Sequence, residues 1–169
     1  MTKDYQNKNG YTVSITDDQI KKHVCQMSNE EIMYLSKKVF EIKSKINADN
    51  NLHLKKRIDV SEINIERYIS IIEGGLLPYK IIEYNETLRD NVLDHRVVIR
   101  DKKKEYRTYH KGKTIETTGW CNLCFVLSID TGKIITAYYN DANDSHTSLD
   151  LRRYDKKLEI IKKEDKVCA

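Results

Sequence analysis

Residues 121–140 read CNLCFVLSIDTGKIITAYYN, the most apolar stretch of this length in the chain. Two runs rich in β-forming residues, 125–129 and 134–139, flank the sequence DTG at 130–132. This short linker is typical of a tight turn, because Gly132 can take a positive φ without steric cost. The stretch therefore predicts a β-hairpin, and we expect that hairpin to form the centre of a sheet.

The composition is that of a folded globular protein. The chain has 169 residues, of which 39% are hydrophobic and 33% charged, with one Pro and six Gly. A chain of this size and composition can bury a core. No apolar run approaches the roughly 20 residues of a membrane span, and the first ten residues, MTKDYQNKNG, have no hydrophobic signal core. We therefore expect a cytoplasmic protein with no membrane partner.

Outward from the hairpin, helical signals come first in the chain and strand signals follow. Helical signals lie at 16–26, 28–46, 51–57 and 61–73. The most distinct is 28–46, where the capping box SNEE precedes apolar residues at helical spacing. Strand signals lie at 80–85, 96–100, 105–110, 125–129 and 134–139, with a loop expected between the first two. Residues 146–161 fit a last strand, a helix or both.

Helices followed by closely spaced strands predict an α+β fold. We expect N-terminal helices packed on a four- to five-stranded, mainly antiparallel sheet, because short connections join antiparallel neighbours. Residues 1–50 are interpreted as an N-terminal helical extension, and residues 51–169 as the principal α+β domain, within a single compact unit.

Positive charge is concentrated between residues 95 and 113. This segment has eight Lys and Arg and two acidic residues, a local charge of +6 in a chain whose net charge is +4. A basic stripe on a nearly neutral protein indicates a surface for a polyanion. A solvated strand face would explain the same pattern without a ligand.

His53 and Arg57 are four residues apart, so on a helix they project from the same face. An imidazole can move a proton near neutral pH, and a guanidinium can hold a phosphate through two hydrogen bonds. The pair therefore suits phosphodiester chemistry. A surface His and Arg on an ordinary helix is the simpler interpretation of these two residues alone.

Alternation along two strands supplies further candidates. Residues 96, 98 and 100 should share one face of a strand, placing Arg96 and Arg100 together and His95 on the opposite face. Thr136 and Tyr138 alternate in the same way on the last strand of the hairpin, followed by Asn140. Hydroxyl groups beside arginines are a plausible cradle for a phosphate, although Thr and Tyr are also common in strands for packing reasons.

The four cysteines do not predict a metal site or a disulfide scaffold. Cys121 and Cys124 have C-x-x-C spacing, but a zinc site needs a second pair of ligands, and Cys25 and Cys168 are isolated. Positions i and i+3 of a strand also point to opposite faces. No phosphate-binding loop, zinc-protease or serine-hydrolase motif occurs, so we expect a site without metal or cofactor.

The order of these pieces resembles the RelE/RegB-like ribonuclease toxins of the barnase/EndoU/colicin/RelE group. The resemblance covers roughly residues 51–140. It consists of H-x-x-x-R at 53–57, a helix ending in Gly-Gly, IIEYN at 81–85, RVVIR at 96–100 and IITAYYN at 134–140.

The resemblance implies RNA cleavage without a metal. A base takes the proton of a ribose 2′-hydroxyl, which attacks the adjacent phosphate, and an acid protonates the departing 5′-oxygen, leaving a 2′,3′-cyclic phosphate. RegB-like enzymes have a second catalytic His in the helix after H-x-x-x-R, which residues 70–73 lack. His95, His146 or Tyr138 are the candidate substitutes. The predicted catalytic residues are His53, Arg57, His95, Arg100, Thr136 and Tyr138; the predicted RNA-binding residues are Lys56, Arg96, Lys102, Lys104, Arg107 and Asn140.

The sequence therefore leads to three alternative functions, of which the first is the principal expectation. The first is an endoribonuclease of toxin or phage type acting on mRNA or tRNA, with an antitoxin or immunity protein as a possible partner. The second is a module that binds RNA or protein through the basic 95–113 face without cleavage. The third is an inhibitor that docks on another protein through residues 1–50.

Overall fold

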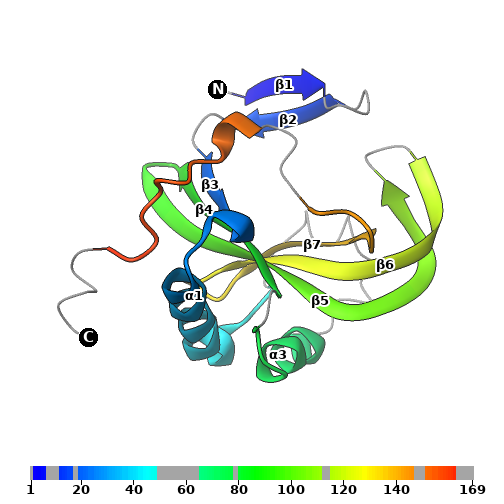
Figure 1. The fold of residues 1–169 in the computed structure, drawn as a ribbon, viewed down its shortest axis with the longest axis horizontal. Helices are drawn as coiled ribbons and strands as arrows, with labels where there is room; N and C mark the ends of the chain where they lie inside the picture. The colour runs from blue at the N-terminus through cyan, green and yellow to red at the C-terminus, as the bar shows by residue number, and fades with distance from the viewer. Residues whose placement is uncertain are drawn as a thin grey trace.

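The structure is a computed structural model that describes residues 2–6, 12–16, 19–48, 65–77, 80–111, 115–146 and 151–162. In these ranges it has two α-helices and a five-stranded antiparallel sheet (Figure 1). The predicted α+β class is confirmed. Within the described ranges, no helix is long and apolar enough to cross a membrane.

The five-stranded sheet has the order β3-β4-β5-β6-β7, and each neighbouring pair is antiparallel. Its strands are β3 (Gln19–His23), β4 (Ile81–Arg89), β5 (Val92–Lys111), β6 (Ile115–Ser128) and β7 (Ile134–Asp141). A separate two-stranded sheet pairs β1 (Thr2–Gln6) with β2 (Thr12–Thr16).

The hairpin at 121–140 forms as predicted, but its predicted place in the sheet was wrong. It corresponds to the β6–β7 pair, and β7 is an edge strand of the five-stranded sheet. The central strand is β5, which pairs with β4 on one side and with β6 on the other. Local apolarity identified a buried hairpin, whereas position in the sheet depends on which strands pair at long range.

Two predictions around β5 were also wrong. The segments 96–100 and 105–110 belong to one strand, which bulges between Arg100 and Lys104 where its register with β6 shifts. The loop expected between 85 and 96 is a tight turn, in which Asp90 and Asn91 have φ values of 51° and 60°. Positive φ at both central residues is the geometry of the two-residue hairpin turns that match strand twist.

The predicted helix at 16–26 was wrong for most of its described residues. Residues 19–23 form β3, which pairs with β4, and a short 3₁₀ helix, η1 (Val24–Gln26), follows. His23 caps η1, since its Nδ1 accepts a hydrogen bond from the backbone N–H of Cys25. The open edge of β4 has overridden a weak local helix preference.

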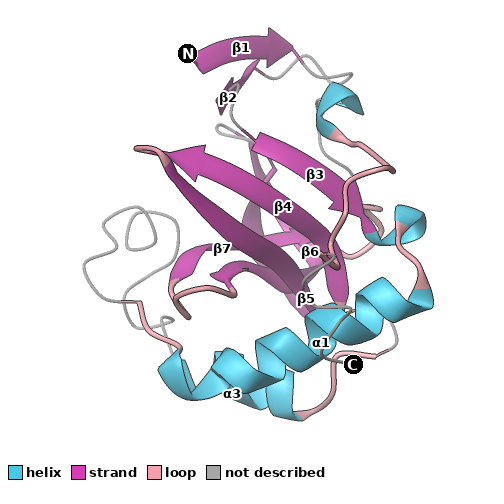
Figure 2. Ribbon diagram, turned by 90° about the vertical axis from the view of Figure 1, so that its left-hand side faces the viewer, coloured by secondary structure: helices cyan, strands magenta, loops and turns pink. Residues whose placement is uncertain are grey.

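Helix α1 (Asn29–Ile42) confirms the predicted amphipathic helix, and η2 (Lys43–Lys45) continues it. Ser28 and Glu31 form the capping box, with each side chain bonded to the backbone N–H of the other residue. Helix α3 (Ile65–Glu73) ends before Gly74, and Gly75 has the positive φ of a helix C-cap. The two helices lie beside each other against one side of the sheet (Figure 2).

The core lies between these helices and the sheet. Helix residues such as Leu35, Val39 and Tyr68 pack against strand residues such as Ile99 and Phe125. On the opposite face of the sheet, the buried apolar cluster among the described residues is small and comprises Ile82, Val98 and Cys124. Polar side chains occupy the rest of that face, so the two sides of the sheet have different chemical character.

The turn of the β6–β7 hairpin lies directly against the chain after α1. Gly132 has φ +78°, and a Cβ built there would lie 2.5 Å from the carbonyl oxygen of Lys45. The backbone N–H of Asn47 donates to the Gly132 carbonyl at 3.0 Å, and the N–H of Ile134 donates to the Asn47 carbonyl at 2.8 Å. Both the backbone conformation and this close approach require glycine.

We expect Gly132→Ala to lower the free energy of unfolding by about 2 kcal/mol, because it combines a disfavoured φ with a backbone clash. Urea denaturation followed by circular dichroism measures this change. Gly119→Ala is the matched control, since its Cβ would meet nothing within 4 Å. Equal stability of the two variants would contradict the role given to the turn.

An ion pair between the buried Lys22 and the half-buried Glu31 joins β3 to α1. Lys22 Nζ lies 2.8 Å from Glu31 Oε2 and also donates to the Leu158 carbonyl at 3.1 Å. The two charged side chains are 6% and 15% exposed. Burial alone would raise the pKa of Glu31, but its bonds to Lys22 and Ser28 outweigh burial, and the net shift is downward.

We expect Glu31→Gln to destabilise the protein by about 3 kcal/mol at neutral pH, because Lys22 would be left buried without its counter-charge. A carboxyl group with a lowered pKa stabilises the fold above its unfolded-state pKa, and this contribution is lost as pH falls through the folded-state pKa. The difference between wild type and variant should therefore shrink in acid. Thermal unfolding between pH 3 and 7 measures it, with the exposed Glu30→Gln as control.

Candidate functional site

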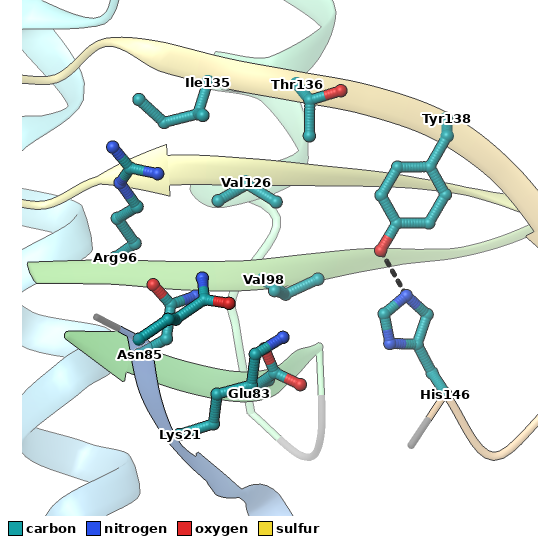
Figure 3. Close-up of a pocket in the computed structure, with 11 residues that line it drawn as sticks. Lys21, Glu83, Asn85, Arg96, Val98, Val126, Ile135, Thr136, Tyr138 and His146 are labelled. Carbon is teal, nitrogen blue, oxygen red and sulfur yellow. Dashed lines mark hydrogen bonds and ion pairs between the residues drawn. The ribbon is translucent and has the colours of Figure 1, made fainter. Parts of the chain in front are cut away.

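A pocket of about 220 Å³ opens on the sheet face that lies away from the helices. Figure 3 shows valines on its floor, Arg96 and Ile135 at one end, and Tyr138 and His146 at the other. This volume corresponds to about seven water molecules, which suits a phosphate and part of its sugar. The lining comes from β3, β4, β5, β6, β7 and the segment after β7: Gln19, Lys21, Glu83, Asn85, Arg96, Val98, Val126, Ile135, Thr136, Tyr138 and His146.

Strand register explains why these side chains meet. Lys21 is opposite Asn85, which is opposite Arg96, and Arg96 is opposite Ser128. Residues directly opposite each other in antiparallel strands point to the same face of the sheet. The predicted alternation of Arg96 against His95 is confirmed, because Arg96 faces the pocket side and His95 faces the helix side.

Tyr138 and His146 form a hydrogen-bonded pair at one end of the pocket. The Tyr138 hydroxyl is hydrogen-bonded to His146 Nε2, and the two rings stack with centroids 5.5 Å apart. Burial, the largest cause, lowers the pKa of His146, and the negative charge of Glu83 offsets only part of this shift. The imidazole is therefore neutral at pH 7 and able to accept a proton.

An ion pair forms the wall next to His146. Glu83 Oε1 lies 3.2 Å from Lys21 Nζ, and Glu83 Oε2 accepts a hydrogen bond of 2.6 Å from the hydroxyl of Tyr154. Glu83 is 3% exposed and the Lys21 side chain 17% exposed. With both carboxylate oxygens engaged, Glu83 acts best as the anchor that holds the Lys21 ammonium at the pocket.

Arg96 supplies a second cation at the opposite end. Its Nε donates to Asp94 Oδ2 at 2.6 Å, which fixes the side chain. No described residue accepts a hydrogen bond from its two terminal nitrogens. A guanidinium anchored through Nε keeps the geometry needed to bind two oxygens of a phosphate.

Thr136 provides a hydroxyl between these two ends. Its Oγ1 is buried and has no hydrogen-bond partner among the described residues, although the residue lines the pocket. Buried hydroxyl groups in folded proteins are nearly always satisfied. A polar atom of a bound molecule is the natural partner for this hydroxyl.

Several other predicted site residues lie elsewhere. His95 Nδ1 is 2.8 Å from Asp130 Oδ2 on the helix side of the sheet. Arg100 is on the pocket side, but its terminal nitrogens donate to the carbonyls of Asp141 and Asp144, each at 2.9 Å. His53, Lys56 and Arg57 lie outside the described residues.

The remaining predicted RNA-binding residues follow the pocket along the sheet. Lys102 and Lys104 are exposed on the bulged part of β5. Arg107 stacks on the ring of Tyr139, with its guanidinium carbon 3.7 Å from the ring centroid. Asn140 is on β7 opposite Asn122. These four residues are outside the lining of the pocket.

Sequence reasoning missed Lys21 and Glu83 and named His146 only as a substitute. Lys21 was assigned to a helix, so no pattern placed it beside β4. Glu83 lies within the strand signal IIEYN, where an acidic residue inside an apolar strand was the available sign of a site. His146 lies beyond β7 with φ 55°, a position that strand periodicity does not reach.

The three cysteines in the described part of the chain, Cys25, Cys121 and Cys124, are outside the pocket lining. Burial raises the pKa of the Cys121 thiol, and raises the pKa of Cys124 to about 12. Both are therefore unreactive thiols at neutral pH. Among the described residues, no three His, Cys, Asp or Glu side chains are grouped to hold a metal ion.

Comparisons with family models, with curated proteins and with solved structures find no match to this chain. The function must therefore be argued from the pocket itself.

We expect Glu83→Gln to lower the pKa of His146 further, because the negative charge of Glu83 favours the imidazolium. NMR titration of the His146 ring protons measures this pKa directly. Glu86→Gln is the matched control, since Glu86 is on the same strand but faces the helix side. A pKa of His146 that stays constant in Glu83→Gln would contradict the arrangement of this wall.

Proposed function

We propose that this chain is an endoribonuclease of toxin or phage type that cleaves mRNA or tRNA in the sheet pocket. The observation that carries the proposal is the convergence of a neutral imidazole with two cationic side chains in one small pocket. Such substrates place the activity in the cytoplasm. An antitoxin or immunity protein is the partner that such an activity would require.

In the proposed reaction, Nε2–H of His146 donates to the Tyr138 hydroxyl oxygen, which orients the ring, and Nδ1 accepts the proton of the ribose 2′-hydroxyl. The 2′-oxygen attacks the adjacent phosphorus, and the bond from phosphorus to the 5′-oxygen breaks. Lys21 donates the proton that the departing 5′-oxygen needs, because Arg96 does not deprotonate in proteins. The products are a 2′,3′-cyclic phosphate and a 5′-hydroxyl.

The other lining groups stabilise the developing charge. Arg96 binds the non-bridging phosphate oxygens through its two terminal nitrogens, and Thr136 donates its unpartnered hydroxyl. Glu83 holds Lys21 in position through their ion pair. The proposed chemistry uses the substrate's own hydroxyl as nucleophile, so it proceeds in the presence of a chelator.

We expect His146→Ala to reduce cleavage of RNA at least 100-fold, the usual contribution of a general base. End-labelled mRNA and tRNA fragments incubated in EDTA, with end-group analysis of the products, measure both rate and chemistry. His95→Ala is the matched control and should cleave at the wild-type rate. Because His146 must be neutral, the rate should fall as pH drops through a pKa below the ordinary 6.5 or so.

The opposite pH dependence, with the rate falling as His146 loses its proton, would contradict its assignment as base. Binding of RNA by the wild-type protein without any product would favour the second expected function, a non-catalytic module. In cells, expression of the wild-type chain should arrest growth, and expression of His146→Ala should not.

A further inference from the structure

Two large aromatic side chains are exposed together on the longest strands. Tyr106 on β5 and Trp120 on β6 are directly opposite each other, with ring centroids 5.4 Å apart in an edge-to-face arrangement. They are 64% and 57% exposed. Single exposed apolar residues are common on protein surfaces, whereas a contacting pair of exposed aromatic rings points to a binding surface.

The pair belongs to a two-stranded arm, residues 104–111 of β5 and 115–120 of β6. These residues extend beyond the pairing of β5 with β4 and of β6 with β7, and the arm curves away from the rest of the sheet (Figure 1). On its helix side, Arg67 Nη2 lies 2.7 Å from Glu105 Oε2, and Arg107 stacks on Tyr139. These contacts fix the arm relative to the domain.

The aromatic pair faces the same side of the sheet as the pocket. Along β6, Val126 lines the pocket, and Cys124, Asn122 and Trp120 follow on the same face by alternation. Six residues of strand separate Val126 from Trp120, or about 20 Å at 3.3–3.4 Å per residue. A few nucleotides of an extended single strand cover that distance.

Positive charge lies between the pocket and the pair. The bulge of β5 carries Lys102 and Lys103, and the amide of Asn122 fixes the bulge by donating to the carbonyls of Asp101 and Lys103, at 3.0 and 3.2 Å. Asn122 is itself buried. The neighbouring acids Asp101 and Glu105 both pair with Arg67, so only one of their two negative charges remains against the three lysines at 102–104.

We propose that Tyr106 and Trp120 form a base-stacking subsite for single-stranded RNA that runs from the pocket across the lysine bulge. The inference rests on the proposed function, which places one end of the bound RNA strand in the pocket. It adds that the substrate class is unpaired RNA. Exposed aromatic rings beside a lysine-rich track are the combination that binds single strands without sequence preference. Bases within a duplex are already stacked on each other and cannot use the subsite.

The test uses the fluorescence of Trp120, the only tryptophan in the chain. Titration of the wild-type protein with a single-stranded 12-nucleotide RNA should quench this fluorescence, and the same sequence as a duplex should not. Tyr106→Ala should weaken the affinity for the single strand about tenfold. Phe40→Ala is the matched control, because Phe40 is an aromatic residue on α1 that is also more than half exposed.

Cleavage kinetics separate the subsite from the pocket. Trp120→Ala should raise KM for the 12-nucleotide RNA about tenfold and leave the cleavage of a dinucleotide, which cannot span 20 Å, unchanged. Trp120→Phe should restore most of the lost affinity, because it keeps an aromatic ring. A loss of kcat on the dinucleotide would show that the substitution acts on the pocket and would overturn the assignment of a separate subsite.

The two proposals fail in distinguishable ways. Quenching by RNA without cleavage would support the subsite and overturn the nuclease. Cleavage of the 12-nucleotide RNA with the same KM in wild type and Trp120→Ala would support the nuclease and overturn the subsite. Concentration-dependent self-association that Trp120→Ala abolishes, with no response to RNA, would identify the aromatic pair as a protein contact and overturn the inference.

Discussion

Pairing of β5 along both of its edges is the constraint on which the rest of the structure depends. A strand that is paired on both sides cannot rotate, so each of its side chains must point to one face or the other. Val97 and Ile99 enter the core beneath the helices, while Arg96 and Val98 face the pocket. A shift of one residue in register would exchange these sets and bury a guanidinium in the apolar core.

This constraint explains how much of the fold could be predicted. Period-two alternation and the capping box at Ser28 depend only on neighbouring residues, so the two faces of β5 and the helix α1 were predicted correctly. The strand β3 was not, because it is strand-like only in the presence of the free edge of β4. Local signals also gave no indication that two short strand patterns around residue 102 are one bulged strand.

The site was predictable to a lesser extent. Arg96, Thr136 and Tyr138 were named because they lie on strands whose alternation is visible in the sequence. Lys21 and His146 come from the two ends of the described chain and meet only because five strands separate and align them. The pairing of strands depends on residues far apart in the sequence. A sequence motif of fixed spacing therefore cannot predict which side chains line this pocket.

The contact between Tyr154 and Glu83 has a consequence for biosynthesis. Both Tyr154 and His146 follow every strand of the sheet in chain order, so a ribosome adds them after the sheet sequence is complete. The wall of the pocket and its imidazole are therefore assembled last. A nascent chain that ends at β7 lacks both Tyr154 and His146, so the pocket is complete only after these later residues are added.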